Sequence, residues 1–392
     1  MTEDSNSYSS THPPLPPTTE DDRLSWLRLL RSRRVGVTTF WRLLSEHGMA
    51  QAALEALPGV AAAAGVDDYR ICSEGVVLAE LKAARAHGAQ PVFRGMPDYP
   101  ALLSDISDPP PLLWVTGDPA ALTRPMVALV GARNASSLGT RMARALAQGL
   151  GQAGFTVVSG LARGIDAAAH LAALDSGTVA VLAGGVDVLY PSENTRLAEQ
   201  IRAQGGALVS EMPMGMQPQA RHFPARNRIV SGMARASVVV EAAAKSGSLI
   251  TARCALEQGR EVLAVPGHPL DARAGGCNIL IRDGAQLVRH AEDVIEALGP
   301  LAAAAAPQPE LPLAEGAPTV PQAAPERRSL RETAALHSEI LARLGPAPLA
   351  EDQLIRDLAA PSDRVSPALT DLELEGRIRR QPGGLLSLAS RA

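Results

Sequence analysis

The residues best placed to do chemistry directly follow an apolar run, Met126 to Val130. Gly131-Ala132-Arg133 comes first, and Ser136 then precedes a segment of helical character, 140–153. Glycine lets a backbone approach an anion closely, a helix N-terminus carries partial positive charge, and arginine offers a planar fork that matches a phosphate. The order therefore indicates a phosphate-binding turn between a buried strand and a helix. The alternative is a turn in which glycine only allows close packing and Ser136 caps the helix.

Similar polar blocks follow five further apolar runs, 156–159, 179–182, 207–210, 237–240 and 261–265. The carboxyl ends of parallel strands meet at one edge of an open sheet, so we expect these blocks to lie together. Each contains glycine, a hydroxyl or arginine, which favours a broad polyanion surface over a pocket for one nucleotide. The blocks are Ser159 to Asp166 with His170, Gly184 to Asp187 with Tyr190-Pro191, Ser210-Glu211 with Arg221 to Arg228, Lys245 to Ser248, and Pro266 to His268 with Gly275 to Asn278.

The block from Phe223 to Arg228 combines an aromatic residue with Arg226, Asn227 and Arg228 in an expected loop. Arginine forks on phosphates beside an aromatic ring that stacks on a base are the means by which proteins hold single-stranded nucleic acid. The alternative is a helix start whose arginines pair with Glu211 or Glu241.

The acidic residues and the histidine at this edge favour structural roles. Asp166 and His170 would share a helix face, which permits a metal pair or an acid–base pair, but the sequence shows no third ligand. We expect Asp166 to cap a helix, His170 to hold a neighbouring loop, and Glu211 and Glu241 to tie down arginines and glycine turns. Neither a metal nor a cofactor is expected. The first turn lacks GxGxxG, and no acidic residue ends the second strand, which argues against a dehydrogenase.

The elements that must position these residues predict an α/β fold, an extended Rossmann-like doubly wound parallel sheet flanked by two small domains. The strands of the sheet are the six apolar runs, with a short one at 286–288 and a closing helix at 291–298. The expected boundaries are a disordered tail (1–22), a helical domain (23–90), a connecting arm (91–125), the Rossmann-like domain (126–300), an Ala/Pro-rich linker (301–329) and a winged-helix-like domain (330–392). The helical domain has turns that resemble helix-hairpin-helix motifs, and the arm contains a strand at 112–115. The last of these combines helices at 330–344, 349–358 and 366–375 with a hairpin at 377–388.

Composition excludes several classes of protein. The chain has 392 residues and a formal net charge of −4, so positive charge must be local if it binds a polyanion. Its 3 cysteines form no CxxC pair, which leaves neither a disulfide framework nor a zinc cluster indicated. No apolar run approaches membrane length and the N-terminus lacks a signal pattern, so a cytoplasmic protein is expected.

These motifs, and the order in which they occur, resemble those of the DNA-processing protein A family (DprA, also called Smf). The shared motifs are Gly131-Ala132-Arg133 with Ser136, Ser159 to Asp166 with His170, Tyr190-Pro191 with Asn194, Ser210-Glu211, Phe223 to Ile229, Ser246 to Ala252, Val265 to Gly267, and Gly275 to Asn278. The resemblance implies a non-enzymatic, homodimeric protein that binds single-stranded DNA, protects incoming strands and loads the RecA recombinase in natural transformation.

Carried over by position, Arg133 would contact a DNA phosphate, and Phe223, Arg226, Asn227 and Arg228 would line the DNA groove. Some members have a lysine near the position of Tyr190-Pro191, and Arg196 is a candidate replacement for it. The remaining DNA-binding candidates are Gly131, Ser136, Arg163, Lys245, Ser246, Gly247 and Ser248.

Two other functions stay open at this point. The first is a Rossmann-type nucleotide-processing enzyme, similar to the lysine-decarboxylase-like phosphoribohydrolases, because Gly247-Ser248 near Glu241 resembles their phosphate loop; their denser PGGxGTxxE pattern is missing. The second is a protein adaptor, suggested by the helical ends of the chain and its acidic balance.

Overall fold

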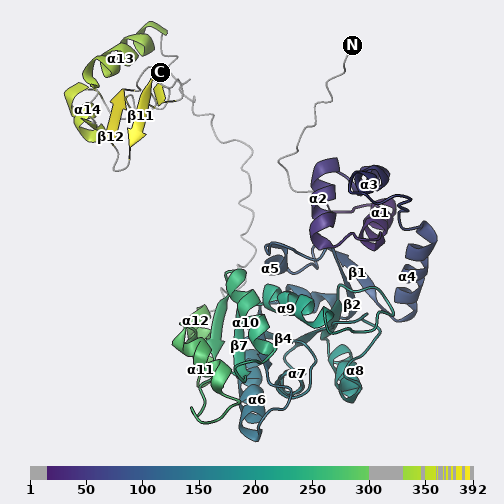
Figure 1. Ribbon diagram of the computed structural model, residues 1–392. Helices are drawn as coiled ribbons and strands as arrows, with labels where there is room; N and C mark the ends of the chain where they lie inside the picture. The colour runs from purple at the N-terminus through teal and green to yellow at the C-terminus, as the bar shows by residue number, and fades with distance from the viewer. Residues whose placement is uncertain are drawn as a thin grey trace, which may run out of the picture. The chain divides into compact units, whose positions relative to one another are not determined.

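The computed structural model describes residues 16–299 and, further on, residues 330–345, 349–358, 360, 365, 368–369, 372–373, 377–381 and 385–388. These residues fall into two compact units, divided between Ala304 and Ala305 (Figure 1). Of the expected tail, residues 1–15 lie outside the described part, and helix α1 already begins at Glu20. The expected linker, 301–329, also lies outside it.

Four helices form the N-terminal part of the first unit: α1 (Glu20–Arg31), α2 (Val37–His47), α3 (Ala50–Ala63) and α4 (Glu74–Ala86). Thr19 begins α1 with a capping box, in which its side chain accepts from the Asp22 backbone and the Asp22 side chain accepts from the Thr19 backbone. The apolar faces of the helices meet around Trp26 and Phe40, whose rings pack edge to face with centroids 5.1 Å apart. The small helical domain expected from the sequence is therefore confirmed.

A nine-stranded sheet forms the centre of this unit, in the order β1-β2-β6-β5-β4-β3-β7-β8-β9. The seven strands from β6 to β9 in that order are parallel, which confirms the doubly wound sheet. The strands are β1 (Gln90–Phe93), β2 (Leu112–Gly117), β3 (Met126–Gly131), β4 (Thr156–Ser159), β5 (Thr178–Val181), β6 (Ala207–Ser210), β7 (Ala236–Glu241), β8 (Glu261–Ala264) and β9 (Gln286–Leu287).

The segment expected to be a connecting arm, 91–125, contributes to the sheet. β1 pairs antiparallel with β2, and β2 pairs antiparallel with β6. Pro91 lies in β1, the edge strand, where a residue without an N–H is tolerated. The proline-rich composition that indicated an arm is thus compatible with an edge strand and a short helix, α5 (Ala101–Ser104).

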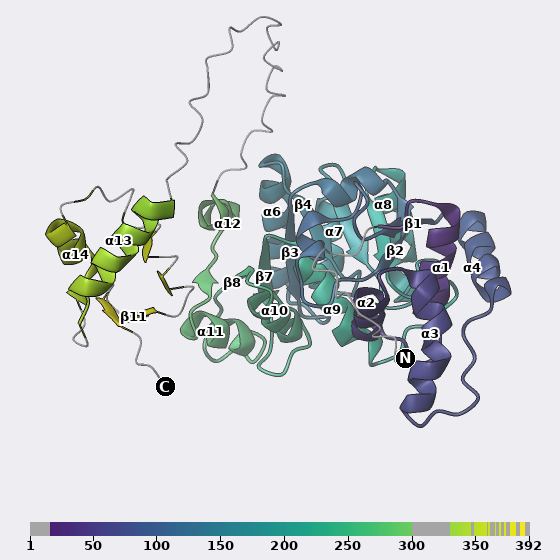
Figure 2. The same ribbon diagram turned by 90° about the horizontal axis from the view of Figure 1, so that it is seen from above.

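Helices cover both faces of the sheet because its parallel strands are apolar on both sides. Consecutive residues of β3, such as Ala128 and Leu129, belong to different core clusters, because they point to opposite faces of the sheet. One face packs against α5, α9 (His222–Met233), α10 (Ser248–Glu257) and α11 (Gly275–Arg282). The other packs against α6 (Ser137–Gln152), α7 (Ile165–Ala172), α8 (Thr195–Ala203) and α12 (Ala291–Leu298) (Figure 2).

The strand order reverses at β3, which lies between β4 on one side and β7 on the other. From β3 the chain first builds the sheet towards β6 and then returns to add β7. Such a switch point leaves an opening at the carboxyl ends of the two strands, where open α/β sheets bind their ligands. The loops after β3, β4 and β7 are therefore the ones that the fold brings to a site.

The second unit contains α13 (Leu330–Arg343), β10 (Leu349–Ala350), α14 (Glu351–Leu358), β11 (Ile378–Gln381) and β12 (Leu385–Leu388). Its strands form an antiparallel sheet in the order β10-β12-β11, and Ile340, Leu354 and Leu386 lie in its core. This arrangement confirms the winged-helix fold. The helix expected at 366–375 lies largely outside the described residues.

Within the described ranges, no helix is both long and apolar enough to cross a bilayer.

Candidate functional site

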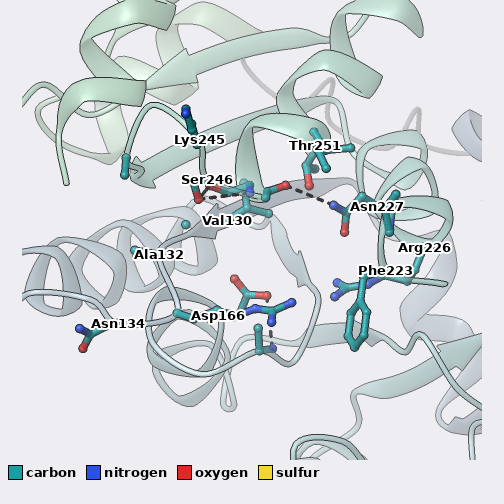
Figure 3. Close-up of a pocket in the computed structure, with 18 of the residues that line it drawn as sticks. Val130, Ala132, Asn134, Asp166, Phe223, Arg226, Asn227, Lys245, Ser246 and Thr251 are labelled. Atoms are coloured by element: carbon teal, nitrogen blue, oxygen red, sulfur yellow. Dashed lines mark hydrogen bonds between the residues drawn. The ribbon is translucent and has the colours of Figure 1, made fainter. Parts of the chain in front are cut away.

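A pocket of about 790 Å³ opens at the switch point, at the carboxyl ends of β3, β4 and β7. Its side chains come from five segments: the turn after β3, the start of α7, the first turns of α9, the loop that leads from β7 into α10, and the loop after β8. Figure 3 shows residues of the first four. Nine of the candidates named from sequence line this pocket: Gly131, Arg133, Phe223, Arg226, Asn227, Lys245, Ser246, Gly247 and Ser248.

The turn after β3 is held by two backbone hydrogen bonds of Ala132. Its N–H donates to the carbonyl of Glu241 over 2.7 Å, and its carbonyl accepts from the N–H of Ile165 over 3.2 Å. Gly131 is required here, because a Cβ at this position would lie 2.6 Å from Ile165 Cγ1. The fixed turn presents Arg133 to solvent at the edge of the pocket.

The N-terminus of α6 is occupied by a carboxylate of the protein itself. Glu241 accepts from the Ser136 N–H over 2.9 Å and from the Ser136 hydroxyl, and that hydroxyl caps the helix by accepting from the Gly139 N–H. The first expectation, a phosphate at this helix start, is therefore corrected: Glu241 takes the place that an external anion would need. Ser136 lines a different pocket, on the far side of the turn.

The Phe223–Arg228 block lies on a helix and not in a loop, since α9 begins at His222. Phe223 contacts two other side chains of the site. The guanidinium carbon of Arg133 lies 5.2 Å from the centre of its ring, and the ring of Tyr190 lies 5.8 Å away, centroid to centroid. A cation and two aromatic rings thus form one cluster at the edge of the pocket.

Arg226 and Asp166 lie in the floor of the pocket, each 6% exposed, and the Arg226 guanidinium points towards the Asp166 carboxylate (Figure 3). Asp166 Oδ2 accepts from the backbone N–H groups of Gly160, over 3.1 Å, and Ala162, over 3.3 Å. Burial raises the pKa of the Asp166 carboxyl, and the charge of Arg226 opposes that rise. Asp166 does not cap α7, as was expected, because Gly164 holds that position.

Arg228 does not line the pocket and has a structural role. Its guanidinium bonds to Asp108 Oδ2 at 2.9 Å and to Glu211 Oε2 at 2.7 Å, and its side chain is 13% exposed. The sequence-based alternative, an arginine that pairs with Glu211, is therefore the correct one for Arg228. Burial raises the pKa of Glu211, and Arg228 lowers it.

The loop before α10 supplies a second group of anion-binding elements. Lys245 is exposed, and the hydroxyls of Ser246 and Ser248 are hydrogen-bonded to each other over 2.8 Å. Asn227 of α9 reaches across to this loop and donates to the carbonyl of Gly247 over 3.4 Å. The first turn of α10 therefore borders the pocket with its partial positive charge.

A smaller pocket of about 330 Å³ adjoins the first, and both are lined by Arg133, Ala162, Phe223 and Arg226. The two pockets therefore form one groove, and we call it the switch-point groove. Arg163 lines its smaller part and lies 3.7 Å from Glu193, with both side chains mostly exposed. Arg196 is exposed on α8 and lines neither part.

His170 is fully buried away from the groove. The Thr178 hydroxyl donates to the carbonyl of Val157, so it accepts from Nδ1–H of His170 over 2.7 Å. Burial, with a smaller contribution from Arg226, lowers the pKa of His170 to about 3, which keeps the ring neutral. Within the described part of the chain no cluster of three metal-binding side chains occurs.

The larger pocket is strongly positive although the whole chain is acidic. Four cations line it, Arg133, Arg226, Lys245 and Arg273, against the single carboxylate of Asp166. Arg273 was not among the candidates from sequence. It follows β8 in a long loop at the same edge of the sheet. Its position after a strand is the sequence signal that would have identified it. The groove has the charge and the aromatic surface to hold a phosphate-bearing chain.

The sequence matches three family profiles. DNA recombination-mediator protein A covers residues 90–299, the DprA-like N-terminal HHH domain covers residues 20–83, and the DprA winged helix domain covers residues 324–384.

Proteins of several bacteria are similar to this chain. Protein Smf of Escherichia coli is 40% identical over 292 residues, which cover 74% of this chain and 75% of Smf. DNA processing protein DprA of Streptococcus pneumoniae is 47% identical over 199 residues, which cover 50% of this chain and 70% of that protein. The X-ray structure of the Streptococcus pneumoniae protein superimposes with a TM-score of 0.58 at 36% identity, covering 69% of this chain and 97% of that one.

Proposed function

This chain belongs to the DNA recombination-mediator protein A family, and we propose that it binds single-stranded DNA in the switch-point groove and loads the RecA recombinase onto it. In natural transformation this activity would protect the incoming strand until recombination begins. The relatives named DNA processing protein DprA support a role in DNA processing.

The observation that carries the proposal is the cluster of Arg133, Phe223 and Tyr190 at the junction of the two parts of the groove. Cations attract the phosphates of either single or double strands, so they supply affinity without discriminating between the two. An aromatic ring adds preference for a single strand, because only an unpaired base can leave its neighbours and stack on the ring.

The proposed contacts divide by chemistry. Arg133, Arg226, Lys245 and Arg163 would bind phosphates, with the start of α10 at Ser246, Gly247 and Ser248, while Phe223 would stack on a base and Asn227 would position the loop before α10. Gly131 would act by allowing the turn that presents Arg133. Arg228, Ser136 and Arg196 are outside this set, because they line neither part of the groove.

We also propose that the protein is not an enzyme. Three carboxylates at this edge that could serve as acids or bases in a hydrolase each have a structural task. Asp166 binds two backbone N–H groups, Glu211 is paired with Arg228, and Glu241 closes the start of α6. We further propose a helical domain that begins with α1 at Glu20, a central domain whose sheet includes β1 and β2, a linker at 301–329 and a winged-helix-like domain at 330–392, in a homodimer in the cytoplasm.

The proposed loading of RecA is tested by reconstituting the assembly of RecA on DNA. A single strand is first coated with single-strand-binding protein, and RecA's DNA-dependent ATP hydrolysis is then followed with and without this chain. The proposal expects the chain to shorten the lag before hydrolysis begins. An unchanged lag with a chain that binds the strand tightly would leave a DNA-binding protein that does not load RecA.

A further inference from the structure

Arg226 differs from the other cations of the groove because its charge is buried. The side chain is 6% exposed, whereas Arg133 and Lys245 are exposed. Its Nε has no hydrogen-bond partner within the described part of the chain. Burial of a guanidinium is costly unless the surroundings compensate it, and the cost here is enough to lower the pKa of Arg226. Some feature of the site must therefore hold this side chain in place.

Gly160 provides the space for the guanidinium. A Cβ added to Gly160 would lie 1.4 Å from Nη1 of Arg226 and 2.3 Å from its Cζ, so any other residue at position 160 displaces the group. Gly160 shows no positive φ, so its backbone conformation is open to alanine. The glycine is therefore needed for the volume it leaves to Arg226 and not for its flexibility.

Asp166 provides the compensating charge. Its carboxylate is the group whose charge favours the protonated guanidinium, and its Oδ2 also holds the N–H groups of Gly160 and Ala162. One carboxylate thus holds the backbone at Gly160, against which Arg226 lies, and supplies a negative charge that favours the protonated guanidinium. The ring of His170 is kept neutral by burial, and the charge of Arg133 opposes that of Arg226 by lowering the pKa of Arg226.

We propose that Gly160 and Asp166 are positioning residues that form a socket for the guanidinium of Arg226 and hold it in the floor of the switch-point groove as a preset contact for one phosphate. The inference rests on the proposed function, since it explains how the most buried of the proposed phosphate contacts, that of Arg226, is formed. Arg226 lines both parts of the groove, so the phosphate it holds lies between a nucleotide in the larger part and one in the smaller part. A group held in its binding geometry before the ligand arrives loses little freedom on binding.

Two opposite effects separate this proposal from simple electrostatics. Asp166 is itself negative, so its removal alone would tighten DNA binding by reducing repulsion. If Asp166 instead acts by positioning Arg226, its removal weakens binding, because a charge-assisted contact to phosphate is lost or misaligned. The sign of the change therefore decides between the two.

The experiment measures binding of the full chain to a labelled oligo-dT over a salt series, for the wild type, Asp166→Asn, Arg226→Gln and Asp166→Asn with Arg226→Gln. Asparagine has the shape of aspartate and still accepts from a backbone N–H. Asp187→Asn is the matched control, since Asp187 also accepts from a backbone N–H, that of Gly215 at 2.9 Å, and lines neither part of the groove. Unfolding of each variant is followed in parallel.

We expect Arg226→Gln to weaken binding about tenfold or more, with a smaller salt dependence because one phosphate contact is lost. Asp166→Asn should weaken binding in the same direction and also lower the salt slope, which a change of stability alone would not do. The double variant should be no weaker than Arg226→Gln, because Asp166 acts through Arg226. Asp187→Asn should bind as the wild type does.

Tighter or unchanged binding by Asp166→Asn, or effects that add in the double variant, would overturn the inference and leave the proposed function standing. If Asp166→Asn does not fold, Gly160→Ala decides, since it displaces the guanidinium without changing a charge; unchanged binding by Gly160→Ala overturns the socket. A wild type that does not bind the strand at all removes the proposed function and the inference together.

Discussion

The guanidinium carbon of Arg133 lies 5.2 Å from the centre of the Phe223 ring, so a cation from the turn after β3 covers an aromatic ring from the start of α9. These residues are far apart in the chain and meet because β3 lies at the switch point of the sheet. Their contact places a guanidinium, which can bind a phosphate, directly beside a ring that can stack on a base. The groove therefore combines, at one point, the two interactions that a single strand offers.

Replacement of Arg133 tests the electrostatic half of this pair. Arg133→Gln should weaken binding of all single-stranded sequences alike and reduce the slope of log K against log salt by about 1, because one phosphate contact is lost. Arg124→Gln serves as the control, since Arg124 is an exposed arginine that lines neither part of the groove. An unchanged slope for Arg133→Gln would remove this turn from the DNA site.

Replacement of Phe223 tests the aromatic half. Phe223→Leu keeps an apolar side chain at a half-buried position and removes the ring, so affinity for oligo-dT should fall by about 1–3 kcal/mol. The salt slope should stay that of the wild type, because no phosphate contact is changed. A loss of affinity confined to low salt would instead mean that the ring serves only to place Arg133.

Arg228 should prove to be a stability residue. Arg228→Met leaves the buried carboxylate of Glu211 without its partner, and breaking a buried pair in this way costs about 3–5 kcal/mol. We expect a lower unfolding free energy and a lower Tm, measured by denaturant and thermal unfolding, while the folded fraction binds DNA as the wild type does.

The control for Arg228 removes both charges. Glu211→Gln combined with Arg228→Met should recover much of the lost stability, since no buried ion is then left unpaired. Weakened DNA binding by folded Arg228→Met, with an unchanged Tm, would contradict this prediction and show that Arg228 contributes to DNA binding.

The buried imidazole of His170 should make stability depend on pH. Its pKa is lowered to about 3 in the folded chain, against 6.5 when exposed, so between these values the unfolded chain binds a proton that the folded chain does not. Stability from this residue is therefore complete above pH 6.5 and is lost as pH falls towards 3, by at most about 1.4 kcal/mol per pH unit.

The contribution of His170 is isolated by comparison with His170→Asn, which keeps a donor near Nδ1 and does not titrate. The difference in unfolding free energy between the two proteins should shrink as pH falls from 6.5 to 3. A difference that stays constant over this range would show that His170 carries the same charge in both states.

The sheet and the identity of most of the site were predictable because their signals are local. Buried parallel strands are apolar on both faces, as in Met126–Val130, and the polar residues that follow them must gather at one edge. That reasoning placed Arg133, Phe223 and Lys245 in one pocket, where the structure has them. The winged helix was also recognisable, from its helices and the hairpin at 377–388.

The features that the sequence left open between alternatives depend on partners far along the chain. Arg228 belongs to the same polar block as Arg226, and only the position of Asp108 and Glu211 turns it away from the groove. The carboxylate at the start of α6 comes from Glu241, which lies at the end of β7, about a hundred residues further along the chain. The start of α9 at His222 had a local signal, since Pro224 fits the first turn of a helix.

The central claim is that the switch-point groove holds single-stranded DNA, and fluorescence anisotropy tests it most directly. A labelled oligo-dT and a duplex of the same length are titrated with the full chain over a series of salt concentrations. The account predicts tight binding of the single strand, weaker binding of the duplex, and an affinity that falls steeply as salt rises. Equal binding of both, or no binding of the single strand at low salt, would contradict it.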